Sequence, residues 1–172
     1  MGLAIVVADT SVIINFLRIN RMDLIGAHPD SFISTDHVGA EIADAYPDQQ
    51  ARYQAALDRG HITQHVVDEP DELELFLRLS QKGRLGSGER SAIAMALNRK
   101  YALVIDDSRA IRQAIEEADI AGNPITIVRT QEVIVDLIKG GSLSVDAANA
   151  IKEDWRLNHR FTLKIGSFSE LL

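Results

Sequence analysis

Acidic side chains recur at positions where predicted strands end or where the following helices begin. Asp9 directly follows a β-branched apolar run, and Asp106 and Asp107 directly follow another. Glu41 and Glu89 each lie near the start of a predicted helix. Carboxylates brought together from separate elements repel one another and raise each other's pKa values, unless a divalent cation compensates them. Oxygen ligands without cysteine or clustered histidine therefore predict Mg²⁺ or Mn²⁺, not zinc.

Each of these acids also has a purely structural interpretation. Glu89 could complement the helix macrodipole, and Glu41 could be a surface charge. Asp106 and Asp107 are adjacent and so diverge, which lets one face a site while the other caps the next helix. Asp9 is harder to explain in this way, because an acid at the end of a buried strand is costly to place without a partner. The prediction of a metal site rests on the acids as a group.

Apolar strands and amphipathic helices alternate along the sequence that carries these acids. Strands are predicted at residues 3–8, 31–34, 62–67, 101–105 and 125–128. Helices are predicted at 12–19, from a cap at 35–37, and at 47–58, 70–81, 87–100, 108–118, 131–138 and 145–157. Such alternation predicts a parallel sheet covered on both faces. In sheets of this kind the working site lies beyond the carboxyl ends of the strands, where the strand order reverses.

Length and composition narrow the class of protein. The 172 residues, of which 46% are hydrophobic, fit one domain with a full hydrophobic core. The absence of cysteine excludes disulfides, thiolate metal sites and cysteine nucleophiles. Residues 3–8 are too few to cross a bilayer, and residues 1–8 lack the basic start of a signal peptide. We therefore expect a cytoplasmic protein with no membrane partner.

The net charge of −7 argues at first against a nucleic-acid partner, because affinity for phosphates comes mainly from lysine and arginine. However, residues 78–112 contain eight basic and three acidic residues and so carry a charge of +5. The remaining chain, with ten basic and twenty-two acidic residues, carries −12. Since local charge meets a substrate, this segment favours a nucleic-acid ligand. The alternative interpretation is a solvated helix face with scattered arginines.

Four stretches of the sequence resemble the motifs of the PIN-domain family. They are Ala8-Asp9-Thr10-Ser11 with Asn15, Val38-Gly39-Ala40-Glu41-Ile42, Gly86-Ser87-Gly88-Glu89-Arg90-Ser91-Ala92-Ile93-Ala94, and Leu103-Val104-Ile105-Asp106-Asp107. The third is the most specific of the set. Many family members have Thr-Asn-Asp in the fourth, so by this register Asp107 takes the metal-site role and Asp106 the variable middle position. Ile105 departs from the family's threonine.

Asp106-Asp107-Ser108-Arg109, together with residues 137–144 and a further helix, resembles a prokaryotic subgroup of VapC-toxin-like ribonucleases. The resemblance covers essentially the whole chain. It implies a three-layer α/β/α sandwich around a central, mainly parallel sheet, in a single domain at 1–172 with a C-terminal helical extension from about residue 141. It also implies a metal-dependent endoribonuclease that hydrolyses RNA phosphodiester bonds, often as the toxin of a type II toxin–antitoxin pair. An antitoxin protein and a second copy of the chain are the implied protein partners.

The resemblance and the residue types together give a set of candidate roles. The predicted catalytic and metal-binding residues are Asp9, Glu41, Glu89 and Asp107, with Asp106 as a further metal ligand. The predicted substrate contacts are Thr10, Ser11, Asn15, Arg84, Arg90 and Arg109. The structural alternatives are helix capping for Thr10 or Ser11 and a buried polar position for Asn15. The five histidines do not have ligand spacing.

Two other classes of function compete with the nuclease. One is a Mg²⁺-binding phosphohydrolase or phosphoacceptor domain, which also gathers aspartates beyond parallel strands. A haloacid-dehalogenase-like enzyme would have Asp-x-Asp after the first strand, whereas Asp9 is followed by Thr10 and Ser11. A response-regulator receiver would have an acid pair there and a lone aspartate later, which is the reverse of this order. The other class is a catalytically silent interaction module, which the sequence does not exclude and which a metal titration would separate from the enzymes.

Overall fold

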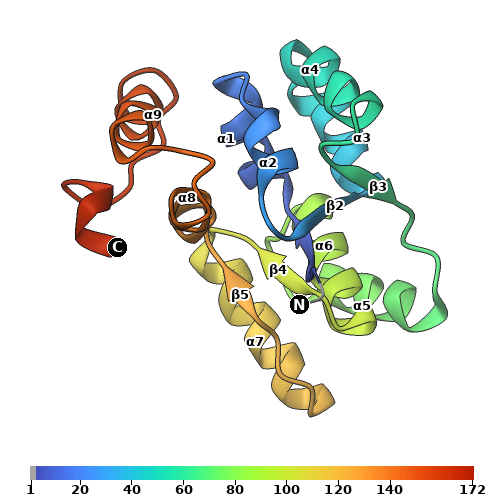
Figure 1. Ribbon diagram of the computed structural model, residues 1–172. Helices are drawn as coiled ribbons and strands as arrows, with labels where there is room; N and C mark the ends of the chain where they lie inside the picture. Colours follow the sequence, from blue (N-terminus) through green and yellow to red (C-terminus); the bar gives the residue numbers. More distant parts are fainter. Residues whose placement is uncertain (1–2) are drawn as a thin grey trace.

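The five strands form one sheet in which every neighbouring pair is parallel (Figure 1). The computed structural model describes residues 3–172; Met1 and Gly2, which open the expected domain and the stretch considered as a signal peptide, lie outside it. The strands are β1 (Ile5–Ala8), β2 (Ser31–Thr35), β3 (Thr63–His65), β4 (Ala102–Val104) and β5 (Ile127–Val128). Their order across the sheet is β3-β2-β1-β4-β5. The predicted parallel sheet is therefore confirmed.

Helices connect the strands, as the sequence pattern predicted. They are α1 (Thr10–Arg18), α2 (Met22–Ala27), α3 (Asp36–Ala45), α4 (Pro47–Asp58), α5 (Pro70–Gln81), α6 (Ser87–Arg99), α7 (Ser108–Ala121), α8 (Thr130–Lys139) and α9 (Val145–Asn158). A 3-10 turn, η1, spans Phe168–Leu171. Neither α2 nor η1 was predicted, because six and four residues are too few to establish a helical period.

Alternate side chains of the strands pack into two separate hydrophobic layers, because successive residues of a strand point to opposite faces. Val7 of β1 and Leu103 of β4 pack with α5, α6 and α7. Val6 of β1 and Val104 of β4 pack with α1, α2, α3, α4, α8 and α9. In Figure 1 these two groups of helices lie on opposite sides of the sheet. The three-layer α/β/α sandwich is confirmed.

The order of the strands reverses at β1. The chain passes from β1 to β2 and β3 on one side, then crosses back to place β4 and β5 on the other side. Ala8 of β1 pairs with Val104 of β4, and the amide of Asp9 donates to the Val104 carbonyl at 3.1 Å. The carboxyl ends of β1 and β4 therefore lie side by side at the reversal, where open α/β sheets bind their ligands.

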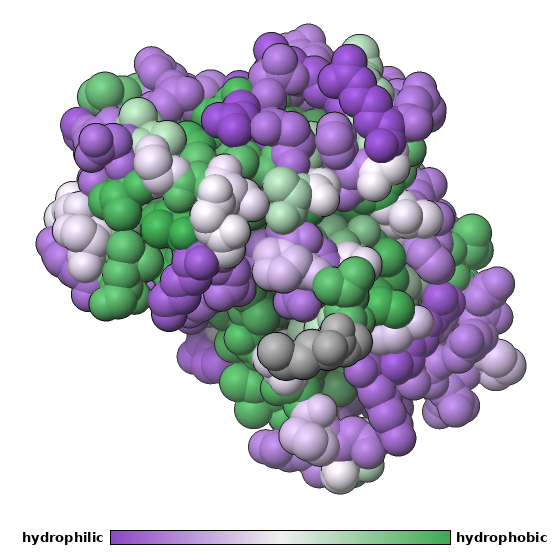
Figure 2. Space-filling model, in the orientation of Figure 1, coloured by the Kyte–Doolittle hydropathy of each residue, from purple (hydrophilic) through white to green (hydrophobic). Residues whose placement is uncertain are grey.

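The C-terminal helix α9 packs on the first helix of the chain. The fully buried Trp155 ring meets Phe16 of α1 edge-on at 5.5 Å, and its Nε1 donates to the Asn15 carbonyl at 2.8 Å. Apolar side chains gather around α9 and η1 on the face drawn in Figure 2. Leu157 of α9 and the C-terminal Leu172 are exposed. Among residues 3–172 no helix combines the length and the apolar composition that crossing a membrane requires.

Candidate functional site

Asp9 is a buried carboxylate with one oxygen left without a partner. It follows β1 and caps α1, where its Oδ1 accepts a hydrogen bond from the Val12 amide at 3.0 Å. Its Oδ2 is buried and accepts no hydrogen bond from the described residues. Burial raises the pKa of Asp9 well above its usual range, the Val12 amide opposes this, and the negative charges of Asp106, Glu89 and Glu41 raise it further. Such a group is stabilised by a proton or a cation.

Glu41 joins α3 to α1 and α6. Its Oε2 accepts hydrogen bonds from the Gly88 amide at 2.8 Å and from the Thr10 hydroxyl at 3.2 Å. A side chain at position 88 could not fit, because its Cβ would overlap Thr10 Oγ1 and lie 2.5 Å from Glu41 Oε2. The glycine of the third motif therefore lets the start of α6 approach Glu41 closely. This contact was not predicted from the sequence.

Glu89 lies in the first turn of α6, on the same edge of the sheet. Its Oε2 accepts a hydrogen bond from the Gly86 amide at 3.1 Å, so the predicted helix-terminal role is present. Burial raises the pKa of Glu89; the Gly86 amide lowers it, the charges of Asp107 and Glu41 raise it, and Arg109 lowers it. The negative charges of Asp107 and Glu41 therefore both act on the Glu89 carboxylate.

Asp106 and Asp107 use their oxygens differently. Asp107 caps α7, and its Oδ1 accepts from the amides of Arg109 and Ala110, both at 2.9 Å. Asp106 binds Thr130 through both oxygens, accepting from the amide at 2.9 Å and from the hydroxyl at 2.6 Å. Asp106 therefore attaches the start of α8 to the end of β4, although its charge also reaches Asp9.

The four carboxylates of Asp9, Glu41, Glu89 and Asp107 share one property. In each, hydrogen bonds within the described chain use one oxygen and leave the other without a partner. No group of three or more His, Asp or Glu side chains within residues 3–172 converges closely enough to form a ready-made cation cage. A set of four carboxylates, one of them buried and incompletely paired, nevertheless fits a hard cation bound partly through water, because Mg²⁺ dehydrates reluctantly.

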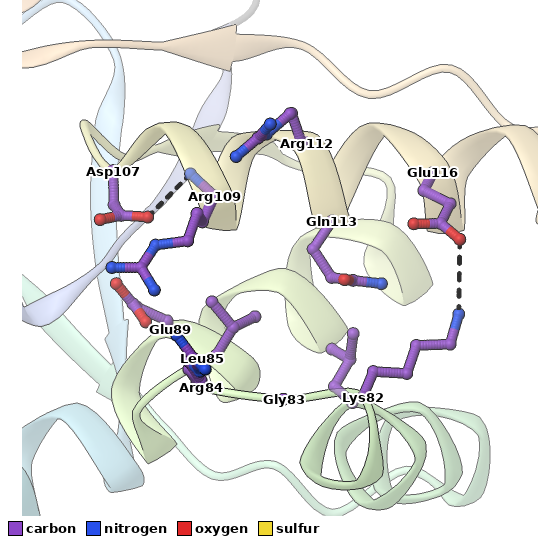
Figure 3. A pocket seen from close by; sticks show the side chains of 11 residues that line it. Lys82, Gly83, Arg84, Leu85, Glu89, Asp107, Arg109, Arg112, Gln113 and Glu116 are labelled. Atoms are coloured by element: carbon purple, nitrogen blue, oxygen red, sulfur yellow. Dashed lines mark hydrogen bonds and ion pairs between the residues drawn. The ribbon is translucent and has the colours of Figure 1, made fainter.

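A cleft of about 560 Å³ extends from Glu89 and Asp107 between α7 and the loop that joins α5 to α6 (Figure 3). Its basic side chains are Lys82, Arg84, Arg109 and Arg112. Lys82 pairs with Glu117 at 2.8 Å, whereas the three arginines form no ion pair with any described residue. In Figure 3 the Arg109 side chain reaches from α7 toward Glu89. The cleft can therefore bind an anionic chain beside the acids.

Lys82, Arg112 and Gln113 line this cleft but were not among the predicted substrate contacts. The signal for two of them was present in the sequence. Arg112 and Gln113 lie three and four positions after Arg109, so they share one side of α7 with it. Lys82 also lines the cleft, because the α5–α6 loop folds back toward α7. No local sequence pattern predicts this fold of the loop.

The remaining predicted substrate contacts are dispersed. Ser11 is exposed in the first turn of α1, and Asn15 is buried one turn later. Arg84 and Arg109 line the cleft, but Arg90 does not. The Arg90 guanidinium lies 4.7 Å from the centre of the Phe76 ring, which also packs against the His37 ring at 4.4 Å. The structure thus places Arg90 in a packing contact and brings the other two arginines to the acids.

Comparisons with known proteins identify one matching family model and several similar solved structures. A family model, DUF3368, described as a PIN domain, matches residues 5–154. No curated protein matches the chain. A solved PilT N-terminus domain protein from the archaeon Sulfolobus solfataricus P2 is 19% identical, with a TM-score of 0.48 over 81% of this chain and 94% of that chain. VapBC2 from Rickettsia felis, solved bound to a DNA fragment from its promoter, is 15% identical, with a TM-score of 0.48 over 73% of this chain and 98% of that chain.

Proposed function

The chain belongs to the PIN-domain family, and from that premise we propose that it is a metal-dependent endoribonuclease that hydrolyses RNA phosphodiester bonds. PIN domains are generally nucleases and typically use divalent metals. The observation that carries the proposal is the buried Asp9 carboxylate, which has one unpartnered oxygen and lies among other acids at the reversal of strand order.

Asp9, Glu41, Glu89 and Asp107 would hold the cation, which is Mg²⁺ or Mn²⁺ because all the donors are carboxylate oxygens. When bound, the cation lowers the pKa of the attacking water, and its positive charge stabilises the scissile phosphate and the leaving 3′ oxygen. Asp106 would contribute through its charge, since both of its oxygens bind Thr130. This assigns the metal-site role to Asp107 and a supporting role to Asp106.

The protein's own groups would orient the carboxylates. The Gly88 amide and the Thr10 hydroxyl fix Glu41, and the Gly86 amide fixes Glu89. Each of these bonds restrains one carboxylate oxygen and leaves the other available. Such preorganisation by backbone amides reduces the reorganisation needed when charge develops on the substrate.

Polar and basic groups beside the carboxylates would hold the RNA. Ser11 and Asn15 would orient a phosphate or a water by hydrogen bonds. Arg84 and Arg109, which have no ion-pair partner among residues 3–172, would contact the phosphates of a single strand. Arg90 would act indirectly, through its packing on Phe76.

The biological setting follows from the resemblance of residues 106–109 and 137–144 to VapC-like toxins. We extend the proposal to the toxin of a type II toxin–antitoxin pair, which acts as a homodimer and is inhibited by an antitoxin protein. Toxicity on expression that is relieved by Asp9→Asn would support this extension. Growth unaffected by the wild-type chain would contradict the toxin role and leave the nuclease proposal in place.

The test of the nuclease is a cleavage assay on tRNA, rRNA and mRNA with Mn²⁺ and with EDTA. We expect cleavage only with Mn²⁺, and none above background for Asp9→Asn. Asp48→Asn, an exposed acid on α4, is the matched control and should cleave as the wild type does. Circular dichroism would verify that both variants are folded. Cleavage that persists in EDTA or in the Asp9→Asn variant would refute the metal site. A folded wild-type chain that neither cleaves RNA nor gains thermal stability from Mn²⁺ would instead be a silent interaction module.

A further inference from the structure

Gln113 of α7 is the one uncharged side chain with hydrogen-bonding groups among the residues that line the cleft (Figure 3). Its Nε2 is buried and has no hydrogen-bond partner in the described part of the chain. Exchanging the amide oxygen and nitrogen would not change this, because neither atom forms a hydrogen bond there. Buried polar groups are rarely left unpaired in folded proteins, so an unpaired one in a residue that lines a cleft is available to a bound molecule.

The surroundings of Gln113 narrow the type of ligand. Arg84, Arg109 and Arg112 line the same cleft, and none of them forms an ion pair with the described residues. The half-buried Leu85 adds an apolar surface to it, whereas Leu79 is only 1% exposed. Cations for phosphates, an apolar surface for a base, and one carboxamide are together the groups that bind a nucleotide.

Helix geometry places Gln113 beyond the scissile bond. Asp107 caps α7, and Gln113 lies six positions later, which corresponds to roughly 9 Å along the helix axis. Gln113 is therefore displaced along α7 from the Asp107 end of the cleft. It can contact a nucleotide that flanks the scissile phosphate along the strand.

We propose that the cleft holds a nucleotide next to the scissile phosphate and that Gln113 recognises the edge of its base, with adenine preferred. This inference rests on the proposed nuclease function. A carboxamide offers one donor and one acceptor, which match the N7 acceptor and the N6 donor of adenine. Bases in single-stranded RNA are unstacked, so that their edges are accessible to side chains. The arginines carry the affinity for the backbone, whereas the uncharged Gln113 determines which base is accepted.

The test is cleavage of a random-sequence single-stranded RNA pool with Mn²⁺, followed by sequencing of the new ends. The wild type should favour adenine at one fixed position from the cut by roughly 5- to 150-fold, the range that one bidentate contact supplies. Gln113→Ala should lose this preference, so that the ratio of cuts beside adenine to cuts beside the other bases falls toward one. Gln113→Glu should shift the preference toward cytosine, whose N4 donates to a carboxylate.

The matched control is Gln50→Ala, an exposed glutamine of α4 in the opposite helical layer, which should retain the wild-type profile. Because the Gln113 amide has no partner in the protein, Gln113→Ala is expected to fold normally, and a melting curve would verify this. An unchanged adenine preference in a cleaving Gln113→Ala variant would overturn the inference and leave the nuclease intact.

A binding measurement separates failure of the inference from failure of the proposed function. The Asp9→Asn chain would be titrated in EDTA with short fluorescent oligoribonucleotides that contain either adenine or cytosine. Tighter binding of the adenine oligonucleotide that depends on Gln113 would sustain the inference even if the wild type cleaved nothing. Equal binding of both would overturn it, and no binding together with no cleavage would overturn both proposals.

Discussion

Buried carboxylates occur in two different settings in this molecule. Between α5, α6 and α7 they are fully paired: Glu72, which is 0% exposed, binds Arg99 through both oxygens. Glu117 accepts from Arg78 at 2.6 Å and from Lys82 at 2.8 Å. Burial alone would raise the pKa of Glu117, but the hydrogen bonds from Lys82 and Arg78 lower it below the usual value.

At the carboxyl ends of β1 and β4 the situation is the opposite. Asp9 is equally buried, yet its partner is a single backbone amide and its charged neighbours are acids, so its pKa is raised. The paired acids join neighbouring helices, and their ion pairs stabilise the folded state. Asp9 costs the fold stability, which is the usual condition of a group retained for a ligand. Pairing therefore distinguishes these two sets of buried acids more clearly than burial does.

The largest effect on stability is expected where pairing is complete. Arg99→Ala leaves Glu72 buried and charged without its partner, so we expect the free energy of unfolding to fall by about 3–5 kcal/mol. Urea denaturation would measure this as a lower midpoint with an unchanged slope. Arg84→Ala removes an exposed arginine without an ion pair in the described chain and should change stability by less than about 0.5 kcal/mol. Equal effects of Arg99→Ala and Arg84→Ala on the free energy of unfolding would show that the ion pair with Glu72 does not stabilise the fold.

A smaller effect of opposite sign is expected at the incompletely paired acid. Asp9→Asn keeps a good helix cap and removes the buried charge, so it should raise the free energy of unfolding by about 1 kcal/mol, or the melting temperature by about 2–4 °C. Because the pKa of Asp9 is higher in the folded state, wild-type stability falls as pH rises from the unfolded to the folded pKa. The gain from Asp9→Asn should therefore be present at neutral pH and vanish near about pH 4.

Glu117→Gln provides the contrasting pH profile. The pKa of Glu117 is lowered on folding, so its contribution to stability is present above the unfolded pKa and is lost as pH falls. The substitution should therefore destabilise the chain at neutral pH and have less effect in acid. Melting curves of both variants over the same pH range would measure the two profiles. If Asp9→Asn and Glu117→Gln changed the free energy of unfolding in the same direction at neutral pH, the contrast between the incompletely paired and the fully paired acid would be wrong.

Two different effects on stability are expected at the adjacent pair after β4, where one acid is fully paired and the other is not. Asp107→Asn retains a capping side chain and should change the free energy of unfolding by only a few tenths of a kcal/mol, while cleavage is lost. Asp106→Asn loses one acceptor for Thr130 and should cost about 0.5–1.5 kcal/mol, with cleavage reduced less. Activity and unfolding measurements on both variants would test this. The reverse pattern would exchange the roles of the two residues.

Local chemistry made much of this fold predictable from the sequence. The bounds of α4 and α5 agree with their predictions, since each begins at a proline in its first turn. Asp9, Asp106 and Asp107 were placed beyond their strands because hydrophobic runs end at them. The predicted third strand, 62–67, is shorter in the structure, where Thr63–His65 pairs with β2. The length of β3 is set by the residues that form hydrogen bonds with β2, and no local sequence pattern determines it.

The parts of the site that were not predicted depend on contacts between distant segments. The Glu41–Gly88 hydrogen bond joins two helices that are 47 positions apart. Arg90 was expected at the substrate because it is basic and follows Glu89, but the ring of Phe76 from another helix holds its guanidinium. The sequence predicted the types of group at the site, and tertiary packing determined which of them meet.

The pairing of β1 with β4 has a consequence for the order in which the chain folds. Ala8 lies beside Val104, 96 positions later, and forming such a distant parallel pair requires a large loss of chain entropy before the contact is stabilised. Partly folded chains that contain only β1, β2 and β3 therefore carry Asp9 and Glu41 without Glu89 or Asp107. On the proposed function, a newly synthesised or locally unfolded chain would lack nuclease activity until this long-range contact closes. The onset of cleavage during refolding would then report the formation of that contact.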